Sequence, residues 1–314
     1  MPILSRRLLL GAAIALPLMS SAALAADKIL ASVPGLSFPF FVHMMNAFKA
    51  EIEKQGYEAI ESDGQVSSPK QTADVEAAIA QGVKGIVISP NEVDAMAPAL
   101  QQAVEANIPV VTVDRRVPSV EGILAHVGAD NVKGGEAQGQ LILKLFPDGA
   151  TIVNLQGQSG ASPAIDRNKG LHNVLDPVKD KYKIVFEQTA GFARDKGLSV
   201  TEAALSALSD PPKVIVAAND DMALGAMEAV KARGLSGIAI IGFDALPEAL
   251  AQVRDGGMTA TIEQFPGKQS SLGVQTLVSF LKDGTKPAKK ILLLTPEAVT
   301  KDNLNIAERL GEVK

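Results

Sequence analysis

Residues 214–233 read VIVAANDDMALGAMEAVKAR, and this stretch decides the fold class. An apolar run from Val214 to Ala218 leads into the polar triplet Asn219–Asp221, and a helical pattern follows from Met222 to Arg233. The apolar run is continuous, which is typical of a strand buried on both faces in a parallel sheet covered by helices. Gly234 can adopt the left-handed conformation that ends a helix. The stretch therefore predicts one strand–turn–helix unit of an α/β protein.

The same unit recurs along the chain. Further runs rich in Val and Ile predict strands at 28–33, 85–89, 109–113, 151–155, 183–186 and 238–243. Amphipathic patterns predict helices at 40–55, 69–81, 93–107, 133–146, 164–174, 197–208 and 267–282. Helix ends are marked by Gly56, Gly82, Asn107 and Gly284. Because strands and helices alternate in two passes, we expect an α/β fold with two Rossmann-like lobes, each a parallel sheet flanked by helices.

Composition limits the function classes. The chain has 314 residues, and its 46% hydrophobic content is ample for a packed core. It has no Cys, which excludes a disulfide framework, thiol catalysis, Cys-ligated zinc and a lipoprotein anchor. The formal net charge is -5, and no long basic run is present. We therefore expect neither nucleic acid nor an anionic membrane surface as a partner.

The first 26 residues have the pattern of a signal peptide. Arg6 and Arg7 form a basic start, residues 8–18 are apolar, and Ala23-Leu24-Ala25 is a small-x-small cleavage signal. A retained membrane anchor is the alternative, but the apolar stretch is too short to span a bilayer. We expect export, by either the general secretory or the twin-arginine route.

Polar and aromatic residues gather where the predicted strands end, and ligands of open α/β sheets bind at the carboxyl ends of strands. The candidate ligand-binding residues are Phe38, Phe40, Phe41, Ser89, Asp114, Arg115, Arg167, Phe192, Asn219, Asp244 and Gln264. Carboxylates, amides and guanidinium groups form hydrogen bonds to vicinal hydroxyls. Aromatic rings cover the C–H face of a sugar ring. This set is typical of a sugar-binding site.

Each candidate also has a simpler interpretation. Asn219 can cap the following helix. Phe40 or Phe41 can belong to the core. Asp114 and Arg115 can form a surface ion pair. The prediction of a site depends on every strand end contributing at once.

No catalytic or metal motif is present in the sequence. Gly267-Lys268 lacks the upstream glycine of a P-loop, no G-x-G-x-x-G follows a strand, and H-E-x-x-H and G-x-S-x-G are absent. His43, His126 and His172 lack metal-ligand spacing, so we expect them to be structural. We expect no enzyme activity, no cofactor and no metal; an enzyme that uses a carboxylate pair on a sugar is the alternative.

Several motifs occur in a specific order. They are Pro39-Phe40-Phe41, Ile108-Pro109-Val110 with Asp114-Arg115, Ala129-Asp130-Asn131, Ala217 to Ala226, Ile241 to Asp244, and Thr261 to Gln264. In this order the chain resembles the type I periplasmic sugar-binding proteins, the ribose-binding-protein-like group that feeds ABC importers. The resemblance covers essentially the whole chain after residue 26.

The resemblance implies two lobes joined by three crossings, near 129–130, 264–265 and 293–294. Residues 27–129 with 265–293 would form the N-terminal lobe, and 130–264 with 294–314 the C-terminal lobe. It implies ring stacking by Phe40, Phe41 and Phe192. It further implies hydroxyl contacts by Asp114, Arg115, Asn219, Asp244 and Gln264. A periplasmic monomer that delivers its sugar to an ABC permease in the inner membrane, without cofactor or chemistry, is the implied function.

Three departures concern the ligand. Phe38 and Ser89 each stand where ribose binders have Asn, and Ile165 stands where their A-A-R-E-R segment has its first Arg, so only Arg167 remains. Ribose would leave some hydrogen bonds unmade, and we therefore expect a different monosaccharide or a polyol.

Two other functions are weighed against transport. A transcription factor of the LacI type shares this core, but it would need a helix-turn-helix where the signal peptide stands. A sensor role, in which the protein docks to a chemoreceptor or a sensor kinase, fits the sequence as well as transport does.

Overall fold

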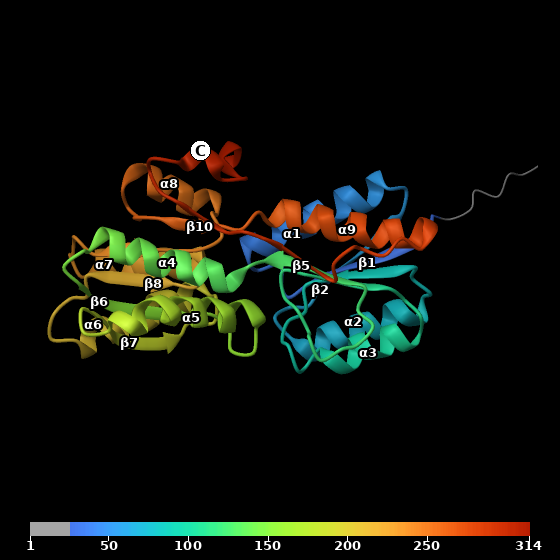
Figure 1. The fold of residues 1–314 in the computed structure, drawn as a ribbon, viewed down its shortest axis with the longest axis horizontal. Coiled ribbons are helices and arrows are strands. Elements are labelled where there is room, and N and C mark those ends of the chain that lie inside the picture. Colours follow the sequence, from blue (N-terminus) through green and yellow to red (C-terminus); the bar gives the residue numbers. More distant parts are fainter. Residues whose placement is uncertain (1–25) are drawn as a thin grey trace, which may run out of the picture.

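The chain folds into two α/β halves that lie side by side (Figure 1). The computed structural model describes residues 26–314. The predicted signal peptide, apart from its last residue, lies outside the described residues.

The N-terminal half is built on a six-stranded sheet in the order β11-β5-β4-β3-β1-β2, and all its neighbouring strands are parallel. The strands are β1 (Lys28–Val33), β2 (Glu58–Asp63), β3 (Gly85–Ile88), β4 (Val110–Val113), β5 (Ala125–Ala129) and β11 (Ile291–Leu294). The helices are α1 (Pro39–Lys54), α2 (Ser68–Ala80), α3 (Ala97–Glu105) and α9 (Pro266–Asp283). Helices α1 and α9 cover one face of this sheet, and α2 and α3 cover the other (Figure 1).

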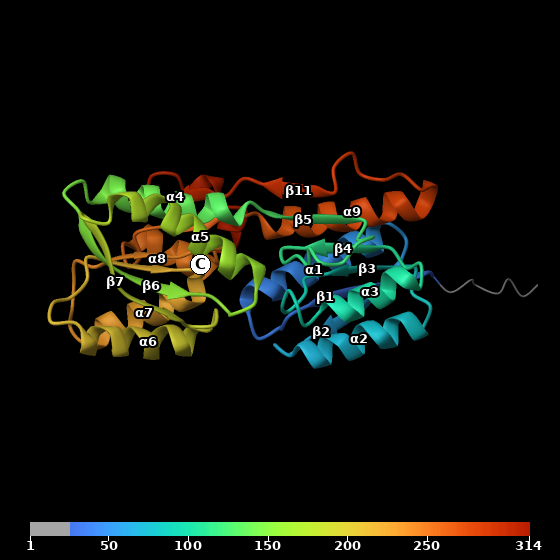
Figure 2. The ribbon, with the colours of Figure 1, turned by 60° about the horizontal axis from the view of Figure 1, so that its bottom comes forward.

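The C-terminal half is built on a four-stranded parallel sheet in the order β7-β6-β8-β9. The strands are β6 (Ala150–Gln156), β7 (Tyr182–Thr189), β8 (Val214–Ala217) and β9 (Ala239–Ile241). The helices are α4 (Asn131–Leu145), α5 (Ser162–Leu175), α6 (Arg194–Ala207), α7 (Asp220–Ala232) and α8 (Pro247–Asp255). Helices α4 and α5 cover one face of the sheet, and α6 and α7 cover the other (Figure 2). Short 3-10 turns occur at Asp176–Val178, Leu304–Ile306 and Leu310–Glu312.

The chain passes between the halves three times. It leaves the six-stranded sheet after β5 to form α4, and it returns after β10 (Thr261–Glu263) to form α9. It leaves again after β11 to form β12 (Glu297–Val299), which pairs antiparallel with β10. Three separate backbone connections therefore join the two halves.

The α/β fold with parallel sheets is confirmed, and each predicted strand and helix overlaps an observed one. The helix ends predicted from Gly and Asn are also confirmed. Their φ angles are positive at Gly56 (89°), Gly82 (69°), Asn107 (59°), Gly234 (66°) and Gly284 (76°).

The structure differs from the prediction in some strands. The sequence did not predict strand β2, because it is an edge strand rich in acidic residues. It did not predict strand β5 either, because His126 and Gly128 interrupt the apolar run of that strand. Strands β11 and β12 and helix α8 were also not predicted. The prediction of burial on both faces is wrong for β7, whose residues alternate between partly buried and exposed because it lies at a sheet edge.

Candidate ligand-binding site

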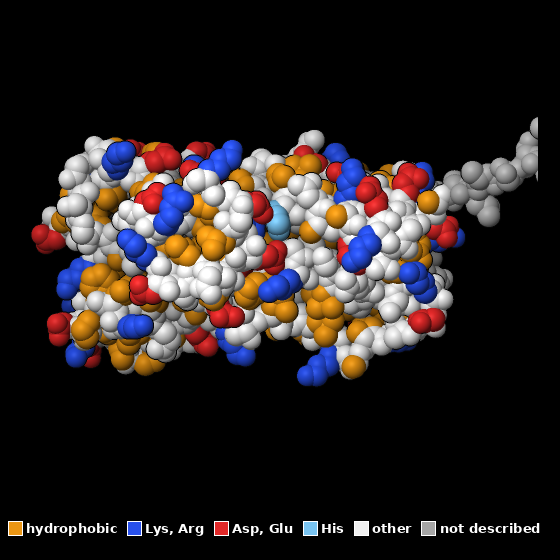
Figure 3. Space-filling model, turned by 90° about the horizontal axis from the view of Figure 1, so that it is seen from above, with side chains coloured by type: hydrophobic (Ala, Val, Ile, Leu, Met, Phe, Trp, Pro, Cys, Tyr) orange, Lys and Arg blue, Asp and Glu red, His pale blue; other side chains and the backbone are white. Residues whose placement is uncertain are grey.

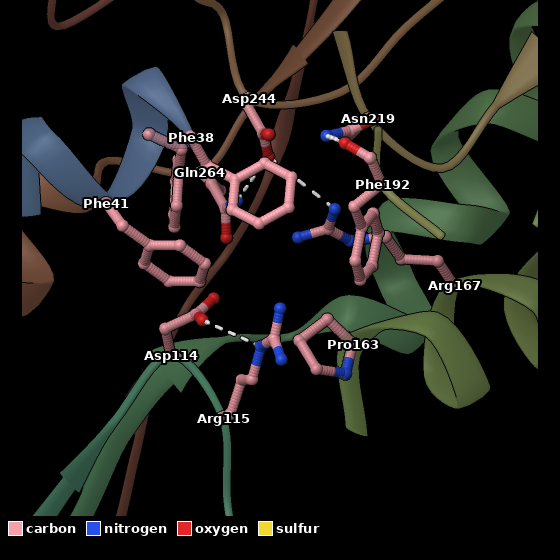
Figure 4. A pocket seen from close by; sticks show the side chains of 11 residues that line it. Phe38, Phe41, Asp114, Arg115, Pro163, Arg167, Phe192, Asn219, Asp244 and Gln264 are labelled. Atoms are coloured by element: carbon pink, nitrogen blue, oxygen red, sulfur yellow. Dashed lines mark hydrogen bonds and ion pairs between the residues drawn. The ribbon is translucent and has the colours of Figure 1, made fainter. Parts of the chain in front are cut away.

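A cavity lies between the two halves. Its walls are formed by Phe38, Phe40, Phe41, Asp114, Arg115, Pro163, Arg167, Phe192, Asn219, Asp244 and Gln264. Figure 4 shows these side chains converging from the ends of strands and the starts of helices. Every candidate from the sequence lines the cavity except Ser89, and Pro163 is an addition.

Three phenylalanines at the start of α1 form one wall. Pro39 occupies the first turn of α1, where its fixed φ favours helix initiation. The Phe40 and Phe41 rings meet edge to face with centroids 5.2 Å apart, and Phe38 meets Phe41 at 6.1 Å. Phe40 and Phe41 are also members of the hydrophobic core. The core interpretation and the cavity position therefore both hold for these two rings.

Asp114 and Arg115 follow β4 and are each 3% exposed, so the interpretation as a surface ion pair is wrong. Arg115 Nε lies 3.9 Å from Asp114 Oδ2 (Figure 4). Burial raises the pKa of Asp114 and lowers the pKa of Arg115 to about 10. These two opposite charges therefore lie next to each other in a buried part of the site.

Ser89 is fully buried behind Asp114 rather than in the cavity wall. Its hydroxyl donates a 3.0 Å hydrogen bond to Asp114 Oδ2. The expectation that Ser89 lines the site is therefore corrected, because its short side chain ends at the Asp114 carboxylate. Ser89 orients Asp114 instead.

The Arg115 guanidinium connects the two halves. Its Nη1 donates to the Asn91 carbonyl oxygen at 2.6 Å and to Gln158 Oε1 of the C-terminal half at 3.2 Å. It lies between the rings of Phe41 and Phe192, at 5.2 and 5.6 Å from their centroids. Its plane is thus fixed by rings and hydrogen bonds from both halves.

Arg167 projects from α5 on the opposite side of the cavity. Its Nη1 donates to the Ala218 carbonyl oxygen at 2.6 Å, and its Nε donates to Asn131 Oδ1 at 2.7 Å. The guanidinium carbon lies 3.6 Å from the centroid of the Phe243 ring. Its Nη1 also lies 3.5 Å from Asp244 Oδ1, so a second acid–guanidinium pair faces the cavity.

Asn219 both caps a helix and lines the cavity. Its Oδ1 accepts a hydrogen bond from the Met222 backbone N–H at 3.0 Å, as a helix N-cap does. Its Nδ2 donates to the Phe192 carbonyl oxygen at 3.0 Å. The capping interpretation is confirmed, and the same residue anchors the loop that carries the Phe192 ring.

Asp244 and Gln264 follow β9 and β10 and are joined by a 2.6 Å hydrogen bond from Gln264 Nε2 to Asp244 Oδ1. Burial raises the pKa of Asp244 to about 7, although Arg167 opposes the shift. Asp244 therefore titrates near neutral pH.

Backbone strain is concentrated at the site. Asp114, Phe192 and Asp244 have φ angles of 61°, 63° and 111°, which side-chain-bearing residues rarely adopt. Each such conformation costs about 1–3 kcal/mol, and such residues cluster at ligand sites. Sequence patterns carry no signal for this strain, because none of the three is a glycine.

Sequence reasoning also missed Gln158 and Pro163. Gln158 lies in the loop between β6 and α5, next to Gly157, whose missing side chain leaves room for the Phe192 ring. Gly157 was the feature of the sequence that could have pointed to this loop as part of the site. Ile165, at the place of the lost arginine, is 55% exposed and points away from the cavity wall.

The histidines make side-chain contacts outside the cavity. His43 pairs with Glu308, His126 with Thr112, and His172 with Asp176 and Glu187. Within residues 26–314, no three acidic or histidine side chains are grouped so that they could hold a metal ion.

A cavity between two α/β halves, lined by two acid–guanidinium pairs and aromatic rings, defines a protein that encloses a small polar ligand. The chain belongs to the periplasmic binding protein family, since residues 29–286 match the model of the periplasmic binding protein domain. Within that family it is a type I sugar-binding protein of the ABC-importer group, as its motifs indicated.

Named relatives bind several sugars and polyols. The ribose import binding protein RbsB of Escherichia coli K12 is 37% identical over 271 residues, which cover 86% of this chain and 90% of that protein. The galactofuranose-binding protein YtfQ of the same organism is 32% identical over 98% of this chain and 99% of its own length. The structure of a Caulobacter myo-inositol binding protein bound to myo-inositol matches with a TM-score of 0.88 and 41% identity, over 91% of this chain and 97% of that one.

Proposed function

We propose that the chain is exported to the periplasm, where it captures a neutral monosaccharide or cyclic polyol other than ribose and delivers it unchanged to an ABC permease. The observation that carries the proposal is the pairing of Asp114 with Arg115 and of Asp244 with Arg167 in one buried, phenylalanine-walled cavity.

The charges in the cavity favour a neutral ligand. Two acidic and two guanidinium side chains line it, so above the pKa of Asp244 the four charges balance, and a ligand with a net charge would leave one buried charge uncompensated. Arg115 Nε is buried and has no protein hydrogen-bond partner. A ligand hydroxyl between Arg115 and Asp114 would accept from the first and donate to the second, which suits a polyhydroxylated compound.

The aromatic walls of the cavity favour a ligand with a single ring. The rings of Phe41 and Phe192 flank this space and can cover the C–H face of one sugar or inositol ring.

The side chains at two positions argue against ribose. Phe38 places an apolar ring in the cavity wall where ribose binders have an amide. The Ser89 hydroxyl donates its hydrogen bond to Asp114 and does not line the cavity. The 41% identity to a protein bound to myo-inositol makes myo-inositol the first compound to test.

The distribution of charge on the face shown in Figure 3 is not that of a protein that binds a polyanion. On the face shown in Figure 3, acidic and basic side chains are intermixed and apolar groups are scattered. No helix in the described part of the chain is long and apolar enough to cross a membrane.

Thermal unfolding across pentoses, hexoses, deoxy sugars, polyols and inositols tests the proposal. The chain has no Trp, so calorimetry or a dye reports the transition. A ligand at 1,000 times its Kd adds about 4 kcal/mol of stability, which raises Tm by roughly 8 °C or more.

One clear hit, with the compound recovered unchanged, supports capture without chemistry. A panel without a hit contradicts the proposal, and conversion of the compound favours an enzyme. Ribose as the tightest ligand contradicts the exclusion of ribose.

A further inference from the structure

Phe38 differs from all other residues of the cavity wall in its exposure. The other lining residues are buried, whereas Phe38 is partly exposed. One side of its ring faces the cavity, so the other side must face the outside of the wall. At this point the wall is one side chain thick.

A groove lies on the outer side of Phe38. It is lined by Ser37, Phe38, Pro39, Ala193, Arg194, Asp195, Leu198, Asp221 and Glu228. The first three precede or begin α1 in the N-terminal half, and the others belong to the α6 and α7 region of the C-terminal half. Phe38 is therefore shared by the walls of the cavity and the groove, and the groove spans the boundary between the halves.

Charged side chains lie along the groove beside its apolar lining. Arg194 Nη2 lies 2.6 Å from Glu248 Oε2 and 3.5 Å from Asp221 Oδ1. Asp195 and Glu228 are exposed at its rim. Carboxylate acceptors and a guanidinium donor at these positions can form hydrogen bonds to the hydroxyls of a substituent that reaches the groove.

The Phe38 side chain is held by few interactions. It occupies the N-cap position of α1, where it makes no capping hydrogen bond, and its ring contacts Phe41 edge to face. Its backbone has an ordinary extended conformation, with φ -97° and ψ 122°. Shortening this side chain should join the cavity to the groove without breaking a side-chain hydrogen bond.

We propose that the Phe38 ring is the partition that restricts the ligand of the wild type to one unsubstituted ring, and that without this ring the groove beyond it becomes an outer subsite for a substituent. The inference rests on the proposed function, because it assigns a size limit to the same cavity. It makes Phe38 a specificity-determining residue.

Calorimetric titration of matched compounds tests the proposal. The probes are myo-inositol and D-galactose, or whichever compound raises Tm most, each with its series of mono-O-methyl derivatives. The wild type should reject every derivative by about 100-fold or more, since a substituent would clash with a full wall. Phe38→Ala should bind the parent compound more weakly and bring at least one derivative to within about 10-fold of it.

Phe41→Ala is the matched control, because it removes an equal ring from the cavity wall but Phe41 does not line the groove. Phe41→Leu replaces it if the alanine variant melts below the assay temperature. Neither control should accept the derivatives. Adding Leu198→Phe to Phe38→Ala narrows the groove alone and should remove the gain.

The outcomes separate the two proposals. If the wild type binds no parent compound, the proposed function fails and this inference fails with it. If the parent binds but Phe38→Ala gains no derivative, or Phe41→Ala gains the same ones, only the partition is overturned. If Leu198→Phe leaves the gain intact, the outer subsite is overturned.

Discussion

The Arg116 guanidinium pairs with both carboxylate oxygens of Asp166 across the boundary between the two halves. Arg116 follows β4 in the N-terminal half, and Asp166 lies on α5 in the C-terminal half. Nearby, the Arg116 backbone N–H donates to Ser162 Oγ and the Val93 N–H to the Gly160 carbonyl oxygen, each at 3.0 Å. Beside the cavity, direct contacts therefore hold the two halves together.

Replacing Asp166 should shift the ligand-free protein toward an open arrangement. Asp166→Asn removes the ionic part of the contact, which for a partly exposed pair is worth up to about 1 kcal/mol. We expect a larger radius of gyration by X-ray scattering and up to about fivefold weaker ligand binding. Asp255→Asn, which breaks a pair within one half, should change neither quantity. Unchanged scattering of Asp166→Asn would show that the pair does not set the closure equilibrium.

Substitutions of Asp114 and of Ser89 should weaken ligand binding to different extents. Asp114→Asn replaces a charged acceptor in the cavity wall, and hydrogen bonds to charged groups contribute about 1.5–3 kcal/mol, so binding should weaken about 10- to 150-fold. Ser89→Ala removes only the bond that orients Asp114 and should cost less than about 10-fold. Titration calorimetry on both variants measures this order. Equal losses would mean that Ser89 contacts the ligand directly.

Asp244 should make stability depend on pH near neutrality. Its pKa is about 7 in the folded protein, against 3.8 for an ordinary Asp. Between these values the folded protein holds a proton that the unfolded chain has released. Stability therefore falls as pH rises through this window, by at most about 1.4 kcal/mol per pH unit, and the contribution is constant above it.

Chemical denaturation of the wild type and Asp244→Asn from pH 4.5 to 8.5 measures this contribution. As pH rises to about 7, the free energy of unfolding of the wild type should fall relative to that of Asp244→Asn. Above about pH 7 the difference between the two should stay constant. Other titrating groups are shared by both proteins and cancel in the difference. A difference that is flat across the whole range would contradict the raised pKa of Asp244.

Gly135 should be required for the position of Arg167. A side-chain carbon at Gly135 would collide with the Arg167 carbonyl oxygen, and one at Gly170 would collide with the Val132 carbonyl oxygen, because α4 and α5 touch through their backbones. Gly135→Ala should therefore push α5 away, cost about 1–3 kcal/mol of unfolding free energy and weaken ligand binding. Gly311→Ala, which meets open space, should do neither. Wild-type stability in Gly135→Ala would show that the helix contact can relax.

Much of the architecture was predictable because it depends on local patterns. Continuous apolar runs such as 214–218 predicted central strands, and Gly56, Gly82 and Gly234 marked helix ends. Strand β2 was not predictable in this way. It lies at the edge of the sheet, beside β1, so acidic residues can occupy its exposed positions and no continuous apolar run marks it. Helix α3 begins at Ala97 rather than 93, because Pro98 has no N–H to bond to residue 94 and fits only the first turn of a helix.

For the candidate site, the sequence supplied the residue types and the structure supplied their arrangement. Strand ends predicted Asp114, Asn219 and Asp244 as ligand-binding residues, and these residues do line one cavity. The sequence could not separate Ser89, one layer behind, from Asp114 in the wall, because both follow parallel strands directly. Nor could it show that Arg115 would reach Gln158 in the other half.

The sequence by itself determined the α/β class, the alternation of strands and helices and the residue types at the strand ends, because hydrophobic periodicity and helix-ending residues act over a few neighbouring positions. Only the tertiary structure decided which of those residues share a cavity, that Phe38 lines both this cavity and the outer groove, and that Arg116 meets Asp166. These relationships join residues from distant segments and both halves. They depend on how the halves pack, which no local pattern encodes.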